Sequence, residues 1–219
     1  MRNPGNKWVI GVDFDNTTVS YDYLLHSVAT EQGLISTAQN PGKREIRDEI
    51  RRLPEGETSW QQLQAVVYGP RIDGAMLIEG VRVFFARCSA EDCQVYIISH
   101  KTEFANFGNP KPNLREAALG WMERQGFFAE PGLGLSRADV FFGATRQEKI
   151  DHICRLRCTH FIDDLEEVFL EPNFPVEVEK ILYTPQPGQT HVDELPGVIK
   201  LATWQDITEH LFGKVIHDS

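Results

Sequence analysis

Acidic and hydroxyl side chains stand at the ends of several apolar runs in this 219-residue chain. Asp13, Ser99 and Asp163 each close such a run. Short apolar runs of this kind are typical of buried parallel strands. The carboxyl ends of parallel strands meet at one edge of a sheet, and ligands bind there. We therefore expect these three side chains to share one site, although they are far apart in the sequence.

Each of these groups has a chemical property that a reaction at one centre can use. Asp13 and Asp163 offer hard oxygen ligands of the kind that Mg²⁺ prefers. Beside a metal, Asp13 can also act as a nucleophile and form an aspartyl-phosphate. Asp15 can donate a proton to a leaving oxygen. Ser99 can hydrogen-bond a phosphoryl oxygen, and Lys149 can neutralise charge on the phosphoryl group. The set as a whole suits phosphoryl transfer, which depends on positioning and charge stabilisation.

The elements that must position these residues alternate between strands and helices. Strands are expected at 7–13, 94–99, 138–143, 159–163 and 179–184. Helices are expected at 114–125, 145–157 and 203–212, and residues 102–113 are expected to form a loop. Lys149 falls in the second of these helices, and Thr203 is the expected N-cap of the third. This alternation predicts the α/β class, with a Rossmann-like, doubly wound parallel sheet.

Residues 20–80 interrupt the alternation, because they contain no strand pattern. Helices are expected there at 21–32, 43–53 and 59–68, the last capped by Ser59, and a further helix at 79–88 leads back to the sheet. We expect a core domain made of 1–19 and 81–219, with an all-helical cap domain inserted at 20–80. Many residues separate Asp15 from Ser99 in the sequence. After a flap and a helix that returns to the sheet are allowed for, about 50 of them remain for this cap.

Composition narrows the partners and the location. Lys and Arg number 22 against 32 Asp and Glu, a net charge of −10, so nucleic acid is not expected as a main partner. No apolar run approaches the ~20 residues of a membrane span. Residues 1–7 lack the apolar segment of a signal peptide. Four cysteines in 219 residues are not a disulfide scaffold, so we expect free thiols and a cytoplasmic protein.

Four motifs, taken in order, resemble those of the haloacid dehalogenase (HAD) superfamily, most of whose members are Mg²⁺-dependent phosphohydrolases. They are Asp13-Phe14-Asp15-Asn16-Thr17, then Ser99, then Lys149, then Asp163-Asp164. The resemblance covers roughly 5–20 and 80–212. It implies that Asp13 is the nucleophile and Asp15 the general acid/base. It also implies that Ser99 and Lys149 bind the transferring phosphoryl group.

The same resemblance implies a Mg²⁺ site and a turn that supports it. Asp13, Asp163 and the backbone carbonyl of Asp15 would hold the ion, and Asp164 would bind through water or support the other carboxylates. Thr17 would brace the turn of the first motif. The chain departs from the family at Asn16, where many members have Gly. This departure is mild, because Asn accepts left-handed backbone better than most residues.

These observations predict a Mg²⁺-dependent phosphoric monoester hydrolase that acts on a small phosphorylated metabolite. Asp15 argues against dehalogenation, because a halide needs no proton when it leaves. A cap would also exclude large protein substrates. Asn16, His100 and Lys101 are predicted to contact the substrate. Two alternatives remain open: a phosphomutase of the same fold, and a non-catalytic scaffold that binds a phosphorylated ligand. A phospho-accepting receiver is disfavoured, because receivers carry no cap of this size.

Overall fold

The computed structural model describes residues 7–36, 42–129, 132–185 and 196–213. The chain divides into two compact units. The first contains Met1–Thr18, Ile78–His100 and Gly126–Ser219, and the second contains Val19–Leu77 and Lys101–Gln125. The stretch 101–125, which the sequence analysis placed in the core domain, is therefore grouped with the unit that contains the insert. The described part of the chain has no helix with the length and apolar character that a bilayer span requires.

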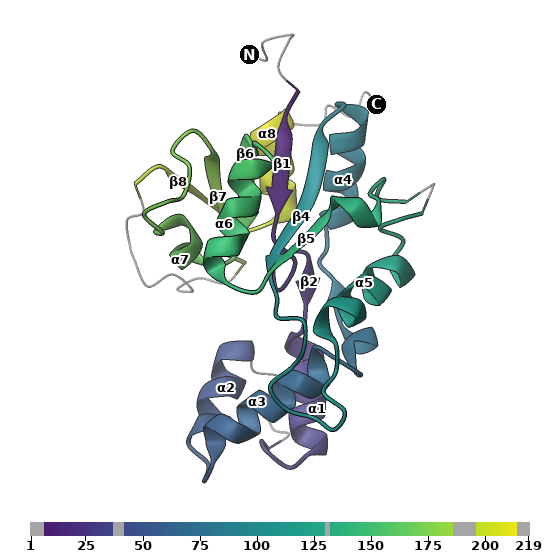
Figure 1. Cartoon of the computed structure of the whole chain (residues 1–219), viewed down its shortest axis with the longest axis vertical. Coiled ribbons are helices and arrows are strands. Elements are labelled where there is room, and N and C mark those ends of the chain that lie inside the picture. Colours follow the sequence, from purple (N-terminus) through teal and green to yellow (C-terminus); the bar gives the residue numbers. More distant parts are fainter. Residues whose placement is uncertain (1–6, 37–41, 130–131, 186–195, 214–219) are drawn as a thin grey trace. The chain divides into compact units, whose positions relative to one another are not determined.

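A six-stranded parallel sheet forms the centre of the first unit, in the order β5-β4-β1-β6-β7-β8 (Figure 1). Its strands are β1 (Val9–Val12), β4 (Gln94–His100), β5 (Val140–Gly143), β6 (His160–Asp163), β7 (Glu179–Tyr183) and β8 (Val198–Leu201). Five of the six match the strands expected from apolar runs, and the predicted Rossmann-like α/β fold is confirmed. The edge strand β8, whose four residues are all half-buried, was not predicted.

The described part of this unit contains the helices α4 (Val81–Ala90), α6 (Arg146–Arg155), the short α7 (Glu166–Phe169) and α8 (Trp204–Phe212). A 3-10 turn at Arg137–Asp139 leads into β5. Helix α6 packs on β4 and β5, while α4 packs against α8. Figure 1 shows α6 in front of the sheet and α8 behind it. The expected N-cap of α8 is confirmed, because the Thr203 hydroxyl accepts a hydrogen bond from the Asp206 N–H at 3.0 Å.

The core under α6 and α7 is aromatic and branched-aliphatic, which holds the strand ends in place. Phe161, Phe169 and Phe174 pack against one another with ring centroids 5.4–6.3 Å apart. Gly11 in β1 is required by this packing, because a Cβ there would lie 2.6 Å from the Phe161 ring. The central strand therefore meets its neighbour's aromatic side chain at closer range than any other residue would permit.

The second unit is mostly helical. Helices α1 (Asp22–Glu31), α2 (Lys43–Arg51) and α3 (Gly56–Val67) contact one another, and α5 (Leu114–Arg124) contacts the 3-10 turn at Ile72–Gly74. Two short strands, β2 (Val19–Ser20) and β3 (Met76–Leu77), pair in antiparallel fashion at the ends of the insert.

Three local expectations were wrong. The range 20–80 does contain a strand, β3, but two residues are too few to show a period. Ser59 is not the cap of α3, since the helix begins at Gly56 after Glu55, whose φ is 55°. The helix expected from 79 begins at Val81, because Gly80 before it has a left-handed φ of 86°.

Candidate active site

Three neighbouring strands bring the predicted carboxylates and hydroxyl to one edge of the sheet. Val12, the last residue of β1, pairs with Ile97 of β4 on one side and Ile162 of β6 on the other. The residues that follow this row carry the polar side chains: Asp13, Asp163 and, one position further along β4, Ser99. The Asp13 N–H continues the ladder by donating to the Ile162 carbonyl oxygen at 2.9 Å. All three polar residues are buried.

Lys149 joins the two carboxylates from the side. Helix α6 follows β5 and places the Lys149 ammonium 2.7 Å from Asp13 Oδ1 and 2.5 Å from Asp163 Oδ2. The Lys149 side chain is 2% exposed, and the two carboxylates are 6% and 0% exposed. Lys149 is thus within hydrogen-bond distance of both carboxylates.

The charges in this buried cluster support one another. Burial alone would lower the pKa of Lys149, but Asp13 and Asp163 outweigh it and raise that pKa above its usual value. Lys149 therefore stays protonated. Burial raises the pKa of Asp163 to about 6, helped by the charge of Asp13 and opposed by Lys149. One ammonium between two buried carboxylates leaves the cluster with a net negative charge when both are ionised, which favours binding of a further cation.

Thr17 links the first motif to the fourth. Its hydroxyl lies 3.3 Å from Asp13 Oδ2 and 3.1 Å from Asp164 Oδ1, and it also accepts a hydrogen bond from the Asp164 N–H at 3.1 Å. Trp204 of α8 donates its indole N–H to the Thr17 carbonyl oxygen at 2.9 Å. The bracing role of Thr17 was expected within its own turn. The contacts to Asp164 and Trp204 were not, because no spacing signal relates residues so distant in sequence.

Ser99 has a hydroxyl that is available for a ligand. The side chain is 1% exposed, and its Oγ has no hydrogen-bond partner within the described residues. A buried polar group without a partner is costly, so such groups often mark a place that a ligand completes. The strand β4 ends one residue later, at His100. Ser99 thus presents its hydroxyl from the same sheet edge that carries Asp13 and Asp163.

The donor set fits a hard divalent cation. Asp13, Asp163 and Asp164 each offer one carboxylate oxygen, and these three oxygens lie within 4.8 Å of one another. Carboxylate oxygens are the ligands that Mg²⁺ takes, usually one or two from the protein with water completing the shell. The Asp163 Oδ1 also accepts the Leu165 N–H at 2.9 Å, which fixes the carboxylate's orientation. These three residues are therefore the candidates for holding a metal ion.

The remaining predicted residues are near strand ends. Asp15 and Asn16 follow β1, His100 is the last residue of β4, and Lys101 is the first residue of the segment 101–125 of the second unit. Asp15 is half-buried after β1, and its carboxyl is not a member of the three-carboxylate cluster. Asn16 has a φ of 61°, so the turn uses the left-handed backbone that Asn tolerates. His100 is exposed, with Nε2 3.0 Å from the Ala144 carbonyl oxygen. Lys101 is buried in the second unit, with its ammonium 5.3 Å from the centroid of the Tyr68 ring.

Solved structures with the same arrangement of elements extend over nearly the whole chain. A HAD-like hydrolase from Streptococcus pneumoniae matches with a TM-score of 0.58 at 13% identity, over 94% of this chain and 98% of its own. A conserved HAD-like protein from Agrobacterium tumefaciens matches with a TM-score of 0.55 at 12% identity, over 94% and 98%. The fold is that of the HAD superfamily. In this chain Ser99 and Asp163 lie on strands of that fold's sheet, Asp13 follows β1, and Lys149 lies on α6.

A HAD family hydrolase from Deinococcus radiodurans, whose structure contains phosphate and sodium, also matches. Its TM-score is 0.51 at 15% identity, over 94% of this chain and 95% of its own. No family model matches the sequence, and no curated protein matches it significantly. At 12–15% identity these matches show a shared fold.

Proposed function

We propose that this chain is a Mg²⁺-dependent phosphohydrolase that cleaves a small phosphorylated metabolite through an aspartyl-phosphate. One observation carries the proposal: Lys149, fully buried, bridges Asp13 and Asp163 at the carboxyl ends of adjacent strands. A buried carboxylate beside a fixed ammonium is oriented for attack, and the ammonium can also stabilise negative charge that develops on a phosphoryl group. The unpartnered Ser99 hydroxyl supplies a donor for the same group.

In the first step, an Asp13 carboxylate oxygen attacks phosphorus and the bond from phosphorus to the ester oxygen breaks. Asp15, protonated, gives its proton to the departing alkoxide, so the alcohol leaves neutral. Lys149 and Ser99 hold the phosphoryl oxygens during the transfer. Thr17 holds Asp13 and Asp164 in register through the hydrogen bonds described above.

In the second step, Asp15 acts as the base. It takes a proton from water, whose oxygen attacks phosphorus, and the bond from phosphorus to the Asp13 oxygen breaks. Inorganic phosphate leaves, and Asp13 returns to its carboxylate form. The same residue thus serves as acid and then as base, so that each proton given in the first step is recovered in the second.

A Mg²⁺ ion at Asp13, Asp163 and Asp164 would supply positive charge that offsets the repulsion between the phosphate and Asp13. We propose the Asp15 backbone carbonyl as a further ligand. Asn16, His100 and Lys101 are proposed to contact the part of the substrate beyond its phosphoryl group. We also propose the cytoplasm as the place of action. The phosphate in the Deinococcus radiodurans structure supports a phosphorylated ligand for this fold.

The test is release of phosphate from p-nitrophenyl phosphate and from a panel of phosphorylated metabolites, with Mg²⁺ and with EDTA. We expect turnover that needs Mg²⁺ and falls by roughly 10³-fold or more in Asp13→Asn, because the nucleophile is lost. Asp92→Asn is the matched control: its side chain is 89% exposed in the turn before β4, at the opposite end of that strand from Ser99. Thermal unfolding of both variants checks that they fold.

Each alternative has its own outcome in this experiment. Transfer of the phosphoryl group to another position of a sugar phosphate, without release to water, would identify a phosphomutase. Metal binding by a folded protein that turns over no ester in the panel would contradict the proposal and favour a non-catalytic scaffold. Turnover that survives in Asp13→Asn would overturn the assignment of the nucleophile.

A further inference from the structure

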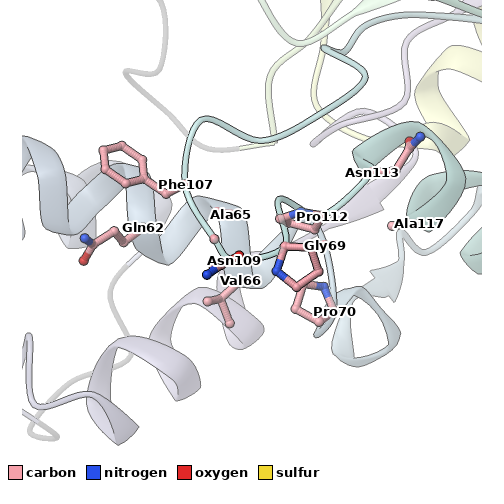
Figure 2. A pocket seen from close by; sticks show the side chains of 12 residues that line it. Gln62, Ala65, Val66, Gly69, Pro70, Phe107, Asn109, Pro112, Asn113 and Ala117 are labelled. Atoms are coloured by element: carbon pink, nitrogen blue, oxygen red, sulfur yellow. The ribbon is translucent and has the colours of Figure 1, made fainter.

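A pocket is formed entirely within the mostly helical unit. A cavity of about 770 Å³ lies between the C-terminal half of α3, the turn at Gly69-Pro70 and the loop 107–113, with Ala117 of α5 also in its wall. Figure 2 shows Phe107 and Gln62 toward one end of this pocket, and Asn113 and Ala117 toward the other. The volume is within the 300–1,000 Å³ that small-molecule sites usually occupy. None of the residues that form it belongs to the carboxylate cluster.

Backbone hydrogen bonds fix the walls of this pocket. The Ala105 N–H donates to the Pro112 carbonyl oxygen at 3.1 Å, and the Leu114 N–H donates to the Glu103 carbonyl oxygen at 2.7 Å, so the loop is closed at its base. Gly69 permits the loop to lie against α3, because a Cβ there would be 2.8 Å from Pro112 Cβ. The cavity is therefore held open by the fold itself, which lowers the entropic cost of binding.

The residues that line the pocket disfavour a charged ligand. Its apolar surface comes from rings and branched side chains, including Val66, Pro70, Phe107, Pro110 and Pro112. No Asp, Glu, Lys or Arg is among the residues that line it. A phosphate or carboxylate placed here would lose its hydration without meeting a cation, which is costly. An uncharged ring system would instead replace water against apolar walls and can stack on Phe107.

Three amides give the pocket a small polar component. Gln62 and Asn109 make no side-chain hydrogen bond within the described residues. Asn113 uses its Oδ1 to cap α5, accepting from the Arg115 and Glu116 N–H groups, and the NH₂ of that amide remains free to donate within the described structure. A few amide donors in an otherwise apolar pocket can orient a ligand that carries a carbonyl, hydroxyl or ring nitrogen.

We propose that this pocket binds an uncharged, mainly apolar small molecule that contains a ring, with Phe107 as the stacking surface. The proposal uses none of the residues assigned to phosphoryl transfer and stands independently of that activity. A proline-rich peptide is the competing occupant, because it could also lie against prolines and an aromatic ring. The cavity's closed loop and its volume favour the small molecule.

The test is a titration of the full-length, isotope-labelled protein with 2-naphthol in EDTA, followed by NMR. We expect saturable shifts of the backbone signals at 62–70 and 107–117. Phe107→Ala should weaken binding by about tenfold, and Ala117→Phe should also weaken it by filling the cavity. Phe104→Ala is the matched control, since Phe104 is in the same loop, 50% exposed and outside the lining.

Two further ligands make the result decisive. 2-Naphthyl phosphate has the same ring with a charge, and it should cause weaker shifts at these positions than 2-naphthol does. A proline-rich peptide should bind more weakly than 2-naphthol. Shifts from 2-naphthol that do not saturate, or that lie outside 62–70 and 107–117, would overturn the proposal. Tighter binding of the charged ring at these residues, or of the peptide, would also overturn it. The mapping on the unsubstituted protein decides the question even if a variant fails to fold.

Discussion

At the scale of single residues, Thr17 connects most of the parts that the chemistry needs. Its one hydroxyl contacts both Asp13 and Asp164, while its carbonyl oxygen accepts from Trp204 of α8. The side chain is fully buried, so these bonds are not exchanged with solvent. Groups that orient metal ligands and nucleophiles from behind are worth roughly 10–100-fold in affinity or activity. Thr17 is thus a positioning residue for the carboxylates and does not itself react.

This role predicts different results for two substitutions. Thr17→Val keeps the shape and removes the hydroxyl, so kcat should fall by about 10–100-fold with KM for p-nitrophenyl phosphate changed much less. Thr17→Ser keeps the hydroxyl and should recover most of the activity. Steady-state kinetics at several Mg²⁺ concentrations provide the measurement. Unchanged kcat in Thr17→Val would contradict the positioning role, because that variant lacks only the hydroxyl.

At the scale of elements, the longer helices and most strands of the sheet were predicted from the sequence, whereas several short elements were not. Five strands of the sheet and the helices carrying Lys149 and Thr203 were found from apolar runs and caps, because such runs reflect burial directly. The strands β2, β3 and β8 and the short helix α7 were not found. The two-residue strands β2 and β3 have no period to detect, and their existence depends on partners that fold beside them.

The candidate site was predictable to the extent that it follows from strand ends. Asp13, Ser99 and Asp163 gather because parallel strands end at one edge, which the sequence pattern indicates. The bridging geometry of Lys149 depends on how α6 packs against β4 and β5, and the apolar pocket depends on a loop folding back on α3. These are tertiary contacts, which residue types and spacing do not encode locally.

Helix α6 permits a test of how an element positions a catalytic group. The Thr145 hydroxyl caps α6 by accepting the Glu148 N–H at 3.1 Å, and Thr203 caps α8 in the same way. Both threonines are exposed. Thr145→Ala and Thr203→Ala should each lower the free energy of unfolding by about 1 kcal/mol, measured by chemical denaturation. Only α6 carries Lys149, so Thr145→Ala should also reduce turnover by roughly tenfold, and by more than Thr203→Ala does.

The two caps serve as controls for each other, because the chemical change and the expected loss of stability are matched. A similar fall in turnover in both variants would indicate that general destabilisation, and not the placement of Lys149, limits the activity. Unchanged turnover in Thr145→Ala would show that packing alone holds the lysine in place.

At the scale of the whole molecule, the net negative charge and the candidate metal site both affect how added salt changes the stability of the folded chain. The chain carries a net charge of −10, so any added salt screens repulsion and can raise its stability to some extent. A bound Mg²⁺ adds a different effect, because an ion that binds only the folded chain stabilises it by RT ln(1 + [L]/Kd), where [L] is the free ion concentration. Folding brings the Asp13 carboxylate to those of Asp163 and Asp164, which are far from it in the sequence. Specific binding and screening can therefore be separated by experiment.

We expect MgCl₂ at about ten times its dissociation constant to raise the Tm of the full chain by roughly 3 °C or more beyond NaCl at matched ionic strength. EDTA should abolish the difference. Asp164→Asn should reduce it, because one of the three ligands is lost, whereas Asp92→Asn removes the same charge from an exposed position and should leave it intact. If the two variants respond alike, or if NaCl matches MgCl₂, the ion acts by screening and the three carboxylates are not a metal site. If the extra rise in Tm with MgCl₂ is lost in Asp164→Asn and kept in Asp92→Asn, the cluster of Asp13, Asp163 and Asp164 binds the cation. This conclusion holds whether or not the protein hydrolyses an ester.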